Sequence, residues 1–400
     1  MSQHINLKRR ALLEMAGCSM ASFATLPLAS AAAAAAPHSL LRTKRLILFT
    51  LEGGNDGLNT VIPVTDPRYR ALRPTVNIAR RDALTIQRDV GLHPRLKQLA
   101  SIFEQGELAI VQAVGYPESS LSHFEAADIW SDAEPKRALR KGGWFTQLMG
   151  ANQALYDAGN FDAAAISFSQ RNGFASGSPV LVASQSTFEQ PVNATDPYAR
   201  TVAPGSPERL VAMLREGDVI AERVSARMAR VPRLQWDGHR EQLDVDVRLT
   251  NWMLEHGINA PLVRLTQGGY DTHAGQLIAH DTLLGKLDAA ISTLRSRLKA
   301  SGQWNDTLIM VQSEFGRRAA QNGFSGTDHG TAGPVLLIGG RVNGRVYGQP
   351  ARLDQLDIDG NVAHRIDFRS LYATIADGLW QLPVNPFARA GFKPLEIVLV

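Results

Sequence analysis

Residues 306–340 read DTLIMVQSEFGRRAAQNGFSGTDHGTAGPVLLIGG, and this stretch decides the fold. It holds two short apolar runs, residues 307–311 and 334–338, each rich in branched side chains and bounded by glycine or polar residues. Runs of this length and composition are typical of buried strands in a sheet that is covered on both faces. The stretch therefore predicts two strands joined by a long polar segment.

The segment between the two runs is rich in glycine, and it carries Glu314, Arg317, Asp328 and His329. A hydrophobic core does not need that density of acidic, imidazole and guanidinium groups beside two buried strands. A solvated loop with a salt bridge would also explain one such segment taken alone. The same pattern follows other predicted strands, which favours a functional site at the strand ends.

Apolar runs and helical patterns alternate along the rest of the chain. We predict further strands at residues 46–51, 108–114, 163–167, 179–183 and 262–265. Helical spacing of apolar residues predicts helices at 93–105, 124–130, 241–256, 280–298 and 368–379. We interpret the polar, proline-containing residues 64–90 as a surface excursion. The alternation predicts an α/β fold with a doubly wound, mainly parallel sheet and helices on both faces.

Polar side chains that suit a metal site recur next to these strands. They are Asp56 and Asn59 after strand 46–51, Ser122 and His123 after 108–114, Asp271 and His273 after 262–265, Glu314 and Arg317 after 307–311, and Asp328 and His329 before 334–338. Ligands of such sheets bind beyond the carboxyl ends of the strands, so we expect these groups at one edge. Carboxylates and imidazoles without cysteine suit zinc, manganese, magnesium or calcium.

Each of these groups also has a purely structural interpretation. Asp56 lies in a Gly-Asn-Asp-Gly sequence that is typical of a turn. Ser122 is well placed as the N-cap of the helix that follows it. Asp271 and His273 would fit a turn, and the acidic and basic side chains of the 306–340 stretch would fit a surface pair. The sequence leaves these alternatives open.

Composition limits the class of partner. The 400 residues are 44% hydrophobic and 20% charged, with a net charge of +4. These are ordinary values for a globular protein. No basic block with interleaved aromatic residues is present, so we do not expect nucleic acid as a partner.

The N-terminus has the features of an export signal. Arg9 and Arg10 precede an apolar, alanine-rich tract that contains Glu14 as its only charge. Adjacent arginines before such a tract are typical of a twin-arginine signal, which the twin-arginine export machinery reads. We predict a signal over residues 1–36, a flexible lead over 37–43 and a single domain over 44–400. We expect no integral membrane span after cleavage and a periplasmic or secreted location.

Five motifs together resemble a known family. They are Gly-Gly-Asn-Asp-Gly-Leu-Asn (53–59), Ser-His-Phe (122–124), Gly-Tyr-Asp-Thr-His (269–273), Ser-Glu-Phe-Gly-Arg (313–317) and Gly-Thr-Asp-His-Gly (326–330). This set resembles an uncharacterised family of twin-arginine-exported bacterial proteins, a domain of unknown function. That family is similar to the alkaline phosphatase and sulfatase superfamily.

The resemblance implies two metal ions at the carboxyl edge of an alkaline phosphatase-like sheet. Asp56, Asp271, His273 and His329 match ligand positions of that superfamily, and Ser122 matches the nucleophile that opens a helix. The superfamily has an Asp-His pair where this chain has Glu314 and Phe315, and phenylalanine cannot bind a metal.

The departure at Phe315 means that one ligand is missing, or that Asp328 or His123 replaces it. Arg317 would pair with an oxygen of the substrate. The resemblance therefore implies a metal-dependent hydrolase whose substrate is a small-molecule or polymer anionic ester of the phosphate or sulfate type. The alternative is a non-catalytic periplasmic binding or interaction protein with a degraded metal site.

Overall fold

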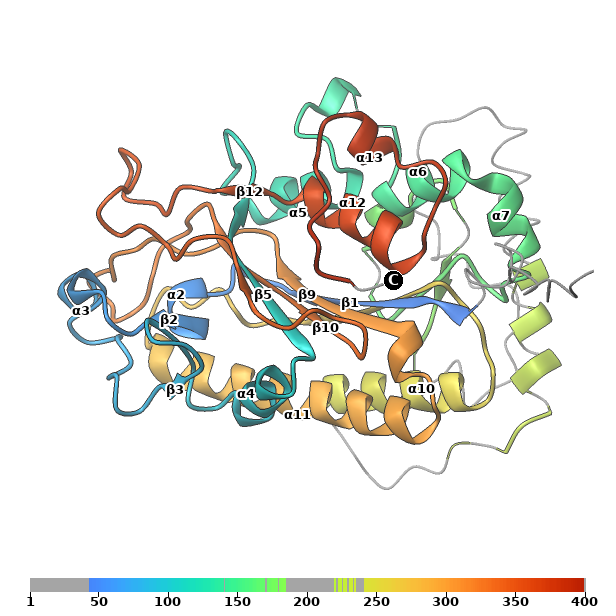
Figure 1. The fold of residues 1–400 in the computed structure, drawn as a ribbon, viewed down its shortest axis with the longest axis horizontal. Coiled ribbons are helices and arrows are strands. Elements are labelled where there is room, and N and C mark those ends of the chain that lie inside the picture. The colour runs from blue at the N-terminus through green and yellow to red at the C-terminus, as the bar shows by residue number, and fades with distance from the viewer. Residues whose placement is uncertain are drawn as a thin grey trace, which may run out of the picture. The chain divides into compact units, whose positions relative to one another are not determined.

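The central sheet of the computed structural model contains nine strands among the residues that are described. Its order is β11-β5-β10-β9-β1-β8-β6-β7, with β12 paired to β5. Their bounds are Arg45–Leu51 (β1), Leu108–Gly115 (β5), Ala165–Ser167 (β6), Val180–Val182 (β7), Leu262–Gln267 (β8), Thr307–Ser313 (β9), Gly333–Ile338 (β10), Val346–Tyr347 (β11) and Ile366–Asp367 (β12). Figure 1 shows β1, β5, β9 and β10 crossing the middle of the molecule.

The structure describes residues 43–398, except 140, 170, 179, 185–218, 221, 225, 229, 233 and 235–240. The predicted export signal at 1–36 lies outside the described residues, as does the predicted lead at 37–43 apart from Thr43. Residues 185–206, which are rich in Ser, Thr, Asn and Pro and which we predict to form a long loop, also lie outside the described residues.

Strand directions bring several strand ends to one edge. β1 pairs in parallel with β8 and β9, whereas β10 runs antiparallel to both β9 and β5. β5 therefore runs in the same direction as β1, and the carboxyl ends of β1, β5, β8 and β9 share an edge. The chain enters β10 at this same edge, which brings residues before Gly333 to the strand ends.

Helices cover both faces of the sheet (Figure 1). On one face lie Lys97–Glu104 (α4), Gln242–Glu255 (α10) and Gln276–Ala300 (α11), and on the other lie His123–Asp132 (α5), Trp144–Ala151 (α6), Arg369–Thr374 (α12) and Pro386–Arg389 (α13). Alternate side chains of β1 serve the two cores: Ile47 and Phe49 pack with the first group, and Leu46 and Leu48 with the second. Burial on both sides explains why the strand sequences are continuously apolar.

The remaining elements are short. They are Gly57–Thr60 (α2), Pro67–Leu72 (α3), Gln153–Ala158 (α7), the 3-10 turns Arg137–Leu139 (η1), Gly173–Ala175 (η2) and Trp304–Asp306 (η3), and the π-helical turn Ile375–Leu379 (η4). Strands Val61–Pro63 (β2), Leu84–Thr85 (β3) and Val90–Leu92 (β4) form a small antiparallel sheet. Within the described part of the chain, no helix has the length and apolar character needed to cross a membrane.

The predicted α/β class with a mainly parallel sheet and helices on both faces is confirmed. The interpretation of residues 64–90 as a surface excursion is wrong in one respect. Tyr69 and Arg73 are buried, because the segment folds back and Arg73 pairs with Asp56 inside the protein. The polar composition of this segment gave no indication that Tyr69 and Arg73 are buried.

Candidate metal centre

Three loops and one helix meet at the shared edge of the sheet. Asp271 and His273 follow β8, Glu314 follows β9, and His329 lies in the segment that enters β10. His123 is the first residue of α5, which follows β5. Strand direction alone therefore brings groups that are far apart in the sequence into one site.

The Nε2 atoms of three imidazoles face the carboxylate of Asp271. The Nε2 atoms of His273 and His329 lie 3.0 and 3.1 Å from Oδ1 of Asp271, and Nε2 of His123 lies 3.5 Å from Oδ2. The Nε2 atoms of His273 and His329 are 3.0 Å apart. We call His123, Asp271, His273 and His329 the histidine–aspartate cluster.

The opposite nitrogen of each imidazole contacts a fixed acceptor. His123 Nδ1 lies 2.8 Å from Glu314 Oε1, and His329 Nδ1 lies 2.9 Å from the carbonyl oxygen of Leu121. His273 Nδ1 lies 3.2 Å from Asp328 Oδ1. These oxygens can accept a hydrogen bond from an Nδ1–H group, and a ring in that tautomer turns the lone pair of Nε2 toward Asp271.

This arrangement fits a metal ion. In the Nδ1–H tautomer, the Nε2 lone pairs of His273 and His329 would face each other and a carboxylate oxygen, and a cation among them would be attracted by all three groups. His123 Nε2 is buried and has no hydrogen-bond partner among the described residues. Histidines that bind metals usually donate their other N–H to a carboxylate or a backbone carbonyl, as all three rings do here. His123, Asp271 and His329 alone place potential ligand atoms within 4.8 Å of one another.

The carboxylate of Asp271 stays ionised near neutral pH. Partial burial raises the pKa of Asp271, but the hydrogen bond and the charge of Arg317 outweigh burial and lower the pKa to about 2. The pKa of Asp328 is also lowered, chiefly by a hydrogen bond from Asn322. The centre therefore combines imidazoles with an ionised carboxylate, and both kinds of group are protein ligands of zinc.

Arg317 is buried and its donors are used inside the protein. It donates to the carbonyl oxygens of Gly53, Gly54, Tyr270 and Thr327, and its Nη2 lies 2.6 Å from Asp271 Oδ1. These acceptors belong to three different segments around the cluster. In this arrangement Arg317 orients Asp271 and joins the loops.

Asp56 lies outside the cluster. Its Oδ2 accepts from Gln276 Nε2 and lies 2.6 Å from Arg73 Nη1, and its Oδ1 accepts from the backbone N–H groups of Leu58 and Asn59. Burial raises the pKa of Asp56, but the charge and hydrogen bond of Arg73 oppose this, and the net pKa is lowered. The predicted role of Asp56 as a ligand stays a prediction, and its carboxylate is committed to protein donors here.

Glu314 and Phe315 contact imidazoles of the cluster. Oε1 of Glu314 also accepts from the N–H of Gly53, and Oε2 accepts from the hydroxyl of Ser313. The ring of Phe315 packs against His123 and His329, with centroid distances of 4.8 Å to each. An apolar ring thus stands where the resemblance implied a histidine, and His123 enters the cluster from α5.

Ser122 is exposed and occupies the N-cap position of α5, but its side chain makes no capping hydrogen bond. Its neighbours on either side, Leu121 and His123, both take part in the centre through contacts with His329 and Glu314. Ser122 therefore stands in the chain between two residues of the centre, and its hydroxyl is not held by the helix. The Ser-His-Phe motif was the sequence signal for this position.

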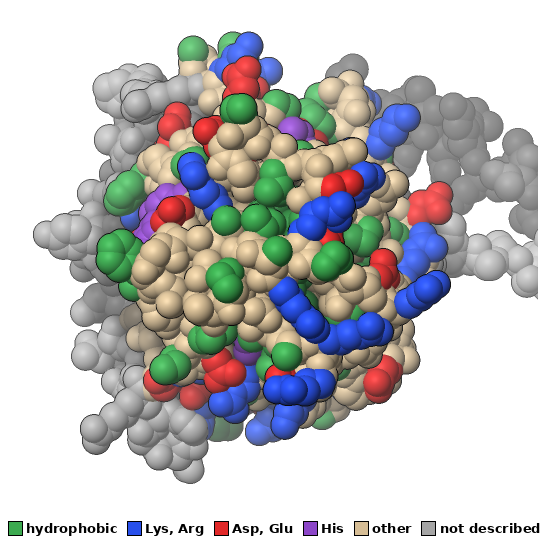
Figure 2. All heavy atoms as spheres, turned by 90° about the vertical axis from the view of Figure 1, so that its left-hand side faces the viewer, with side chains coloured by type: hydrophobic (Ala, Val, Ile, Leu, Met, Phe, Trp, Pro, Cys, Tyr) green, Lys and Arg blue, Asp and Glu red, His purple; other side chains and the backbone are tan. Residues whose placement is uncertain are grey.

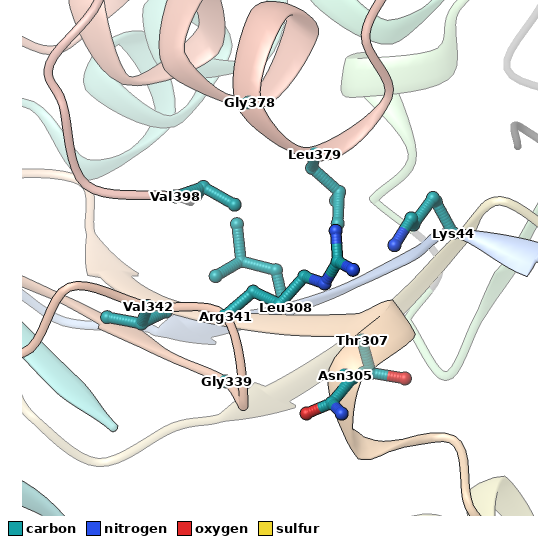
Figure 3. A pocket seen from close by; sticks show the side chains of 10 residues that line it. All are labelled: Lys44, Asn305, Thr307, Leu308, Gly339, Arg341, Val342, Gly378, Leu379 and Val398. Carbon is teal, nitrogen blue, oxygen red and sulfur yellow. The ribbon is translucent and has the colours of Figure 1, made fainter. Parts of the chain in front are cut away.

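A separate pocket lies at the opposite edge of the sheet (Figure 3). Its lining includes Lys44 and Thr307, which stand at the amino ends of β1 and β9, and Arg341. Lys44 Nζ lies 2.7 Å from Asp306 Oδ1. The pocket shares no residue with the histidine–aspartate cluster.

Residues 249–380 match a family model described as a protein of unknown function, DUF1501. This match agrees with the predicted resemblance to a domain of unknown function and covers three of its five motifs. No curated protein matches the sequence.

Solved structures resemble this chain over most of its length at low sequence identity. The PsFucS1 sulfatase from Pseudoalteromonas sp. is 11% identical, with 90% of this chain and 72% of that chain covered and a TM-score of 0.39. A protein in the alkaline phosphatase superfamily from Vibrio parahaemolyticus is 10% identical, with 83% and 65% covered and a TM-score of 0.38. The phosphonate monoester hydrolase SpPMH from Silicibacter pomeroyi is 13% identical, with 84% and 73% covered and a TM-score of 0.36.

Proposed function

We propose that this chain is an exported, metal-dependent hydrolase of phosphate- or sulfate-type esters. One divalent ion would be held by His123, Asp271, His273 and His329. The observation that supports this most strongly is the convergence of three Nε2 atoms on Asp271 while each Nδ1 contacts a fixed acceptor. The proposed export signal would place the protein in the periplasm or outside the cell.

The donor set favours zinc among the ions considered. Imidazole suits zinc, whereas calcium and magnesium take oxygen ligands. Glu314, Asp328 and the carbonyl oxygen of Leu121 would hold the three rings in the tautomer that binds a metal. A bound divalent ion would act as a Lewis acid and make a hydroxyl or a water nucleophilic near neutral pH.

The chain supplies the other groups that such a reaction needs. Ser122 would attack the ester or position a water, since it directly precedes His123 in the chain and its hydroxyl makes no capping bond to α5. The N–H groups in the first turn of the ten-residue helix α5 would bind an oxygen of the anionic ester. Hydrolysis forms a bond between phosphorus or sulfur and the attacking oxygen and breaks the bond to the leaving oxygen, which takes up a proton. If Ser122 is the attacking group, water would then displace its oxygen in a second step.

A non-catalytic periplasmic binding protein on the same fold is the second candidate. The observation that favours it is Phe315, because this ring fills the space against His123 and His329 and offers no ligand for a second ion. Such a protein would bind its ion and an anion without turnover.

A substrate screen on metal-analysed protein tests the proposal. The mature protein and His329→Ala are loaded with zinc or manganese and assayed on aryl phosphates, phosphodiesters and aryl sulfates. His364→Ala serves as a matched control, because His364 is partly buried and lies outside the cluster. Turnover that His329→Ala loses and His364→Ala keeps would support the hydrolase. A metal-loaded protein that is inactive on every ester class would instead leave the binding protein as the better account.

A further inference from the structure

An aromatic side chain lies exposed at the border of the centre. Phe124 follows His123 in the first turn of α5, and 69% of its side chain is exposed. The guanidinium of Arg171 lies over this ring, with its central carbon 4.6 Å from the ring centroid. A guanidinium at this distance is attracted electrostatically to the negative face of the ring.

This contact presents Arg171 to solvent in a restricted orientation. The guanidinium is planar, and stacking of its face on a ring leaves the N–H groups along its edge free to bind a carboxylate, phosphate or sulfate. Arg171 is exposed, and among the described residues it has no carboxylate within ion-pair distance. Its backbone N–H is fixed by the hydroxyl of Ser169 at 3.2 Å.

Two other arginines around the centre are committed to groups of the protein, whereas the buried Nε of Arg318 has no hydrogen-bond partner among the described residues. Arg73 pairs with Asp56, and Arg317 binds carbonyl oxygens and Asp271. The charge of Arg318 acts on Asp328 and lowers the pKa of that carboxyl. An anionic substrate that extends beyond the cluster toward α5 would therefore meet a cation without a carboxylate partner at Arg171.

A second guanidinium, that of Arg264, contributes positive charge in this region. Arg264 on β8 is buried, its Nη2 lies 3.5 Å from Glu52 Oε1, and its central carbon lies 5.7 Å from the ring of Phe174. Burial is the main cause that lowers the pKa of Arg264 to about 10, and the nearby positive charge of Arg171 acts in the same direction. The two arginines thus lie close enough to contribute to one local potential, which attracts anions.

We propose that Phe124 and Arg171 form a subsite for a second anionic group of the substrate. The preferred ester would then carry a carboxylate, sulfate or phosphate in addition to the group that is hydrolysed. This inference rests on the proposed function, because it assumes that the first anionic group binds at the histidine–aspartate cluster. Phe124 orients the guanidinium, and Arg171 binds the second anion.

Phosphonates test this subsite without turnover. Titration calorimetry on zinc-loaded protein compares phosphonoacetate, 3-phosphonopropionate and 4-phosphonobutyrate with alkylphosphonates of matched chain length. We expect at least one carboxylate member to bind roughly tenfold more tightly than its alkyl match, as hydrogen bonds to a charged group warrant. Arg171→Gln should abolish this preference, Arg171→Lys should keep part of it, and Phe124→Leu should weaken it.

The control is Arg81→Gln, because Arg81 has a side chain that is 88% exposed and belongs to another part of the chain. This variant should keep the carboxylate preference, and all variants should keep their zinc content. Equal binding of the carboxylate and alkyl members by the wild type, or a preference that survives in Arg171→Gln, would overturn the subsite alone. If no phosphonate binds the zinc-loaded wild type, the subsite and the anion site of the proposed function both fail.

Discussion

The ion pair between Asp56 and Arg73 lends itself to a quantitative test. Both side chains are buried, with exposures of 1% and 0%, and Arg73 Nη1 lies 2.6 Å from Asp56 Oδ2. Arg73 also donates to Asn59 Oδ1 at 2.8 Å and to the carbonyl oxygens of Ala319 and Arg318. Arg73→Met leaves the carboxylate of Asp56 buried without its cation, so we expect a loss of about 3–5 kcal/mol in the free energy of unfolding.

Urea unfolding at neutral pH, followed by tryptophan fluorescence, measures this loss. The double variant Asp56→Asn/Arg73→Met should recover part of the stability, because it removes the unpaired charge. Asp56 has a lowered pKa when folded, so its contribution is present above the unfolded pKa and disappears as the pH falls through the folded value. At low pH the stability difference between Arg73→Met and the wild type should therefore shrink.

Two outcomes would contradict this expectation. A loss below about 1 kcal/mol in Arg73→Met would show that the buried pair does not anchor the α2 region. An Asp56→Asn variant that keeps its stability but loses its bound metal would show that Asp56 is a ligand, as the family resemblance implied. We expect the opposite, a less stable protein that still binds metal when folded.

Three further predictions concern the cluster and the buried histidines. Glu314→Gln should lower metal affinity about 10–100-fold by weakening its contact with His123 Nδ1, and competition with a chelator measures this. Arg317→Lys should also weaken metal binding, because lysine cannot hold Asp271 and the surrounding carbonyls together; unchanged affinity would contradict this. Burial lowers the pKa of His280 to about 4, so unfolding titrations should show stability falling from about pH 6.5 toward pH 4, and His280→Gln should flatten that slope.

The strands were predictable because each is marked by an apolar run, which is a local feature of the sequence. Apolar runs such as 307–311 and 262–265 are buried on both faces, and each lies within a strand of the structure. The direction of β10 was not predictable in the same way. Its run looks like that of a parallel strand, but it follows β9 without an intervening helix and pairs antiparallel.

Part of the candidate site follows from the same topology. Asp271, His273 and His329 come together because they adjoin strand ends at one edge of the sheet. His123 was predicted among the polar groups at the strand ends and as a possible replacement for a missing ligand, but nothing in the sequence shows which way its ring points. The structure provides that information through the contact between His123 Nδ1 and Glu314.

The parts of the site that the sequence did not predict depend on contacts between separate segments of the chain. The sequence does not show that Arg73, 17 residues beyond Asp56, folds back to neutralise it. Nor does it show that Arg317 turns inward to backbone carbonyls, because an arginine beside a site is equally compatible with binding a substrate. These contacts depend on how separate segments pack, which no local pattern encodes.

The central claim is that His123, Asp271, His273 and His329 hold one metal ion. X-ray absorption spectroscopy of the zinc-loaded mature protein tests it most directly, with metal content measured on the same sample. We predict one ion per chain and a shell of nitrogen and oxygen ligands at about 2.0–2.1 Å with strong imidazole scattering. A protein that binds no ion, or an ion whose ligand shell lacks histidine, would contradict the account.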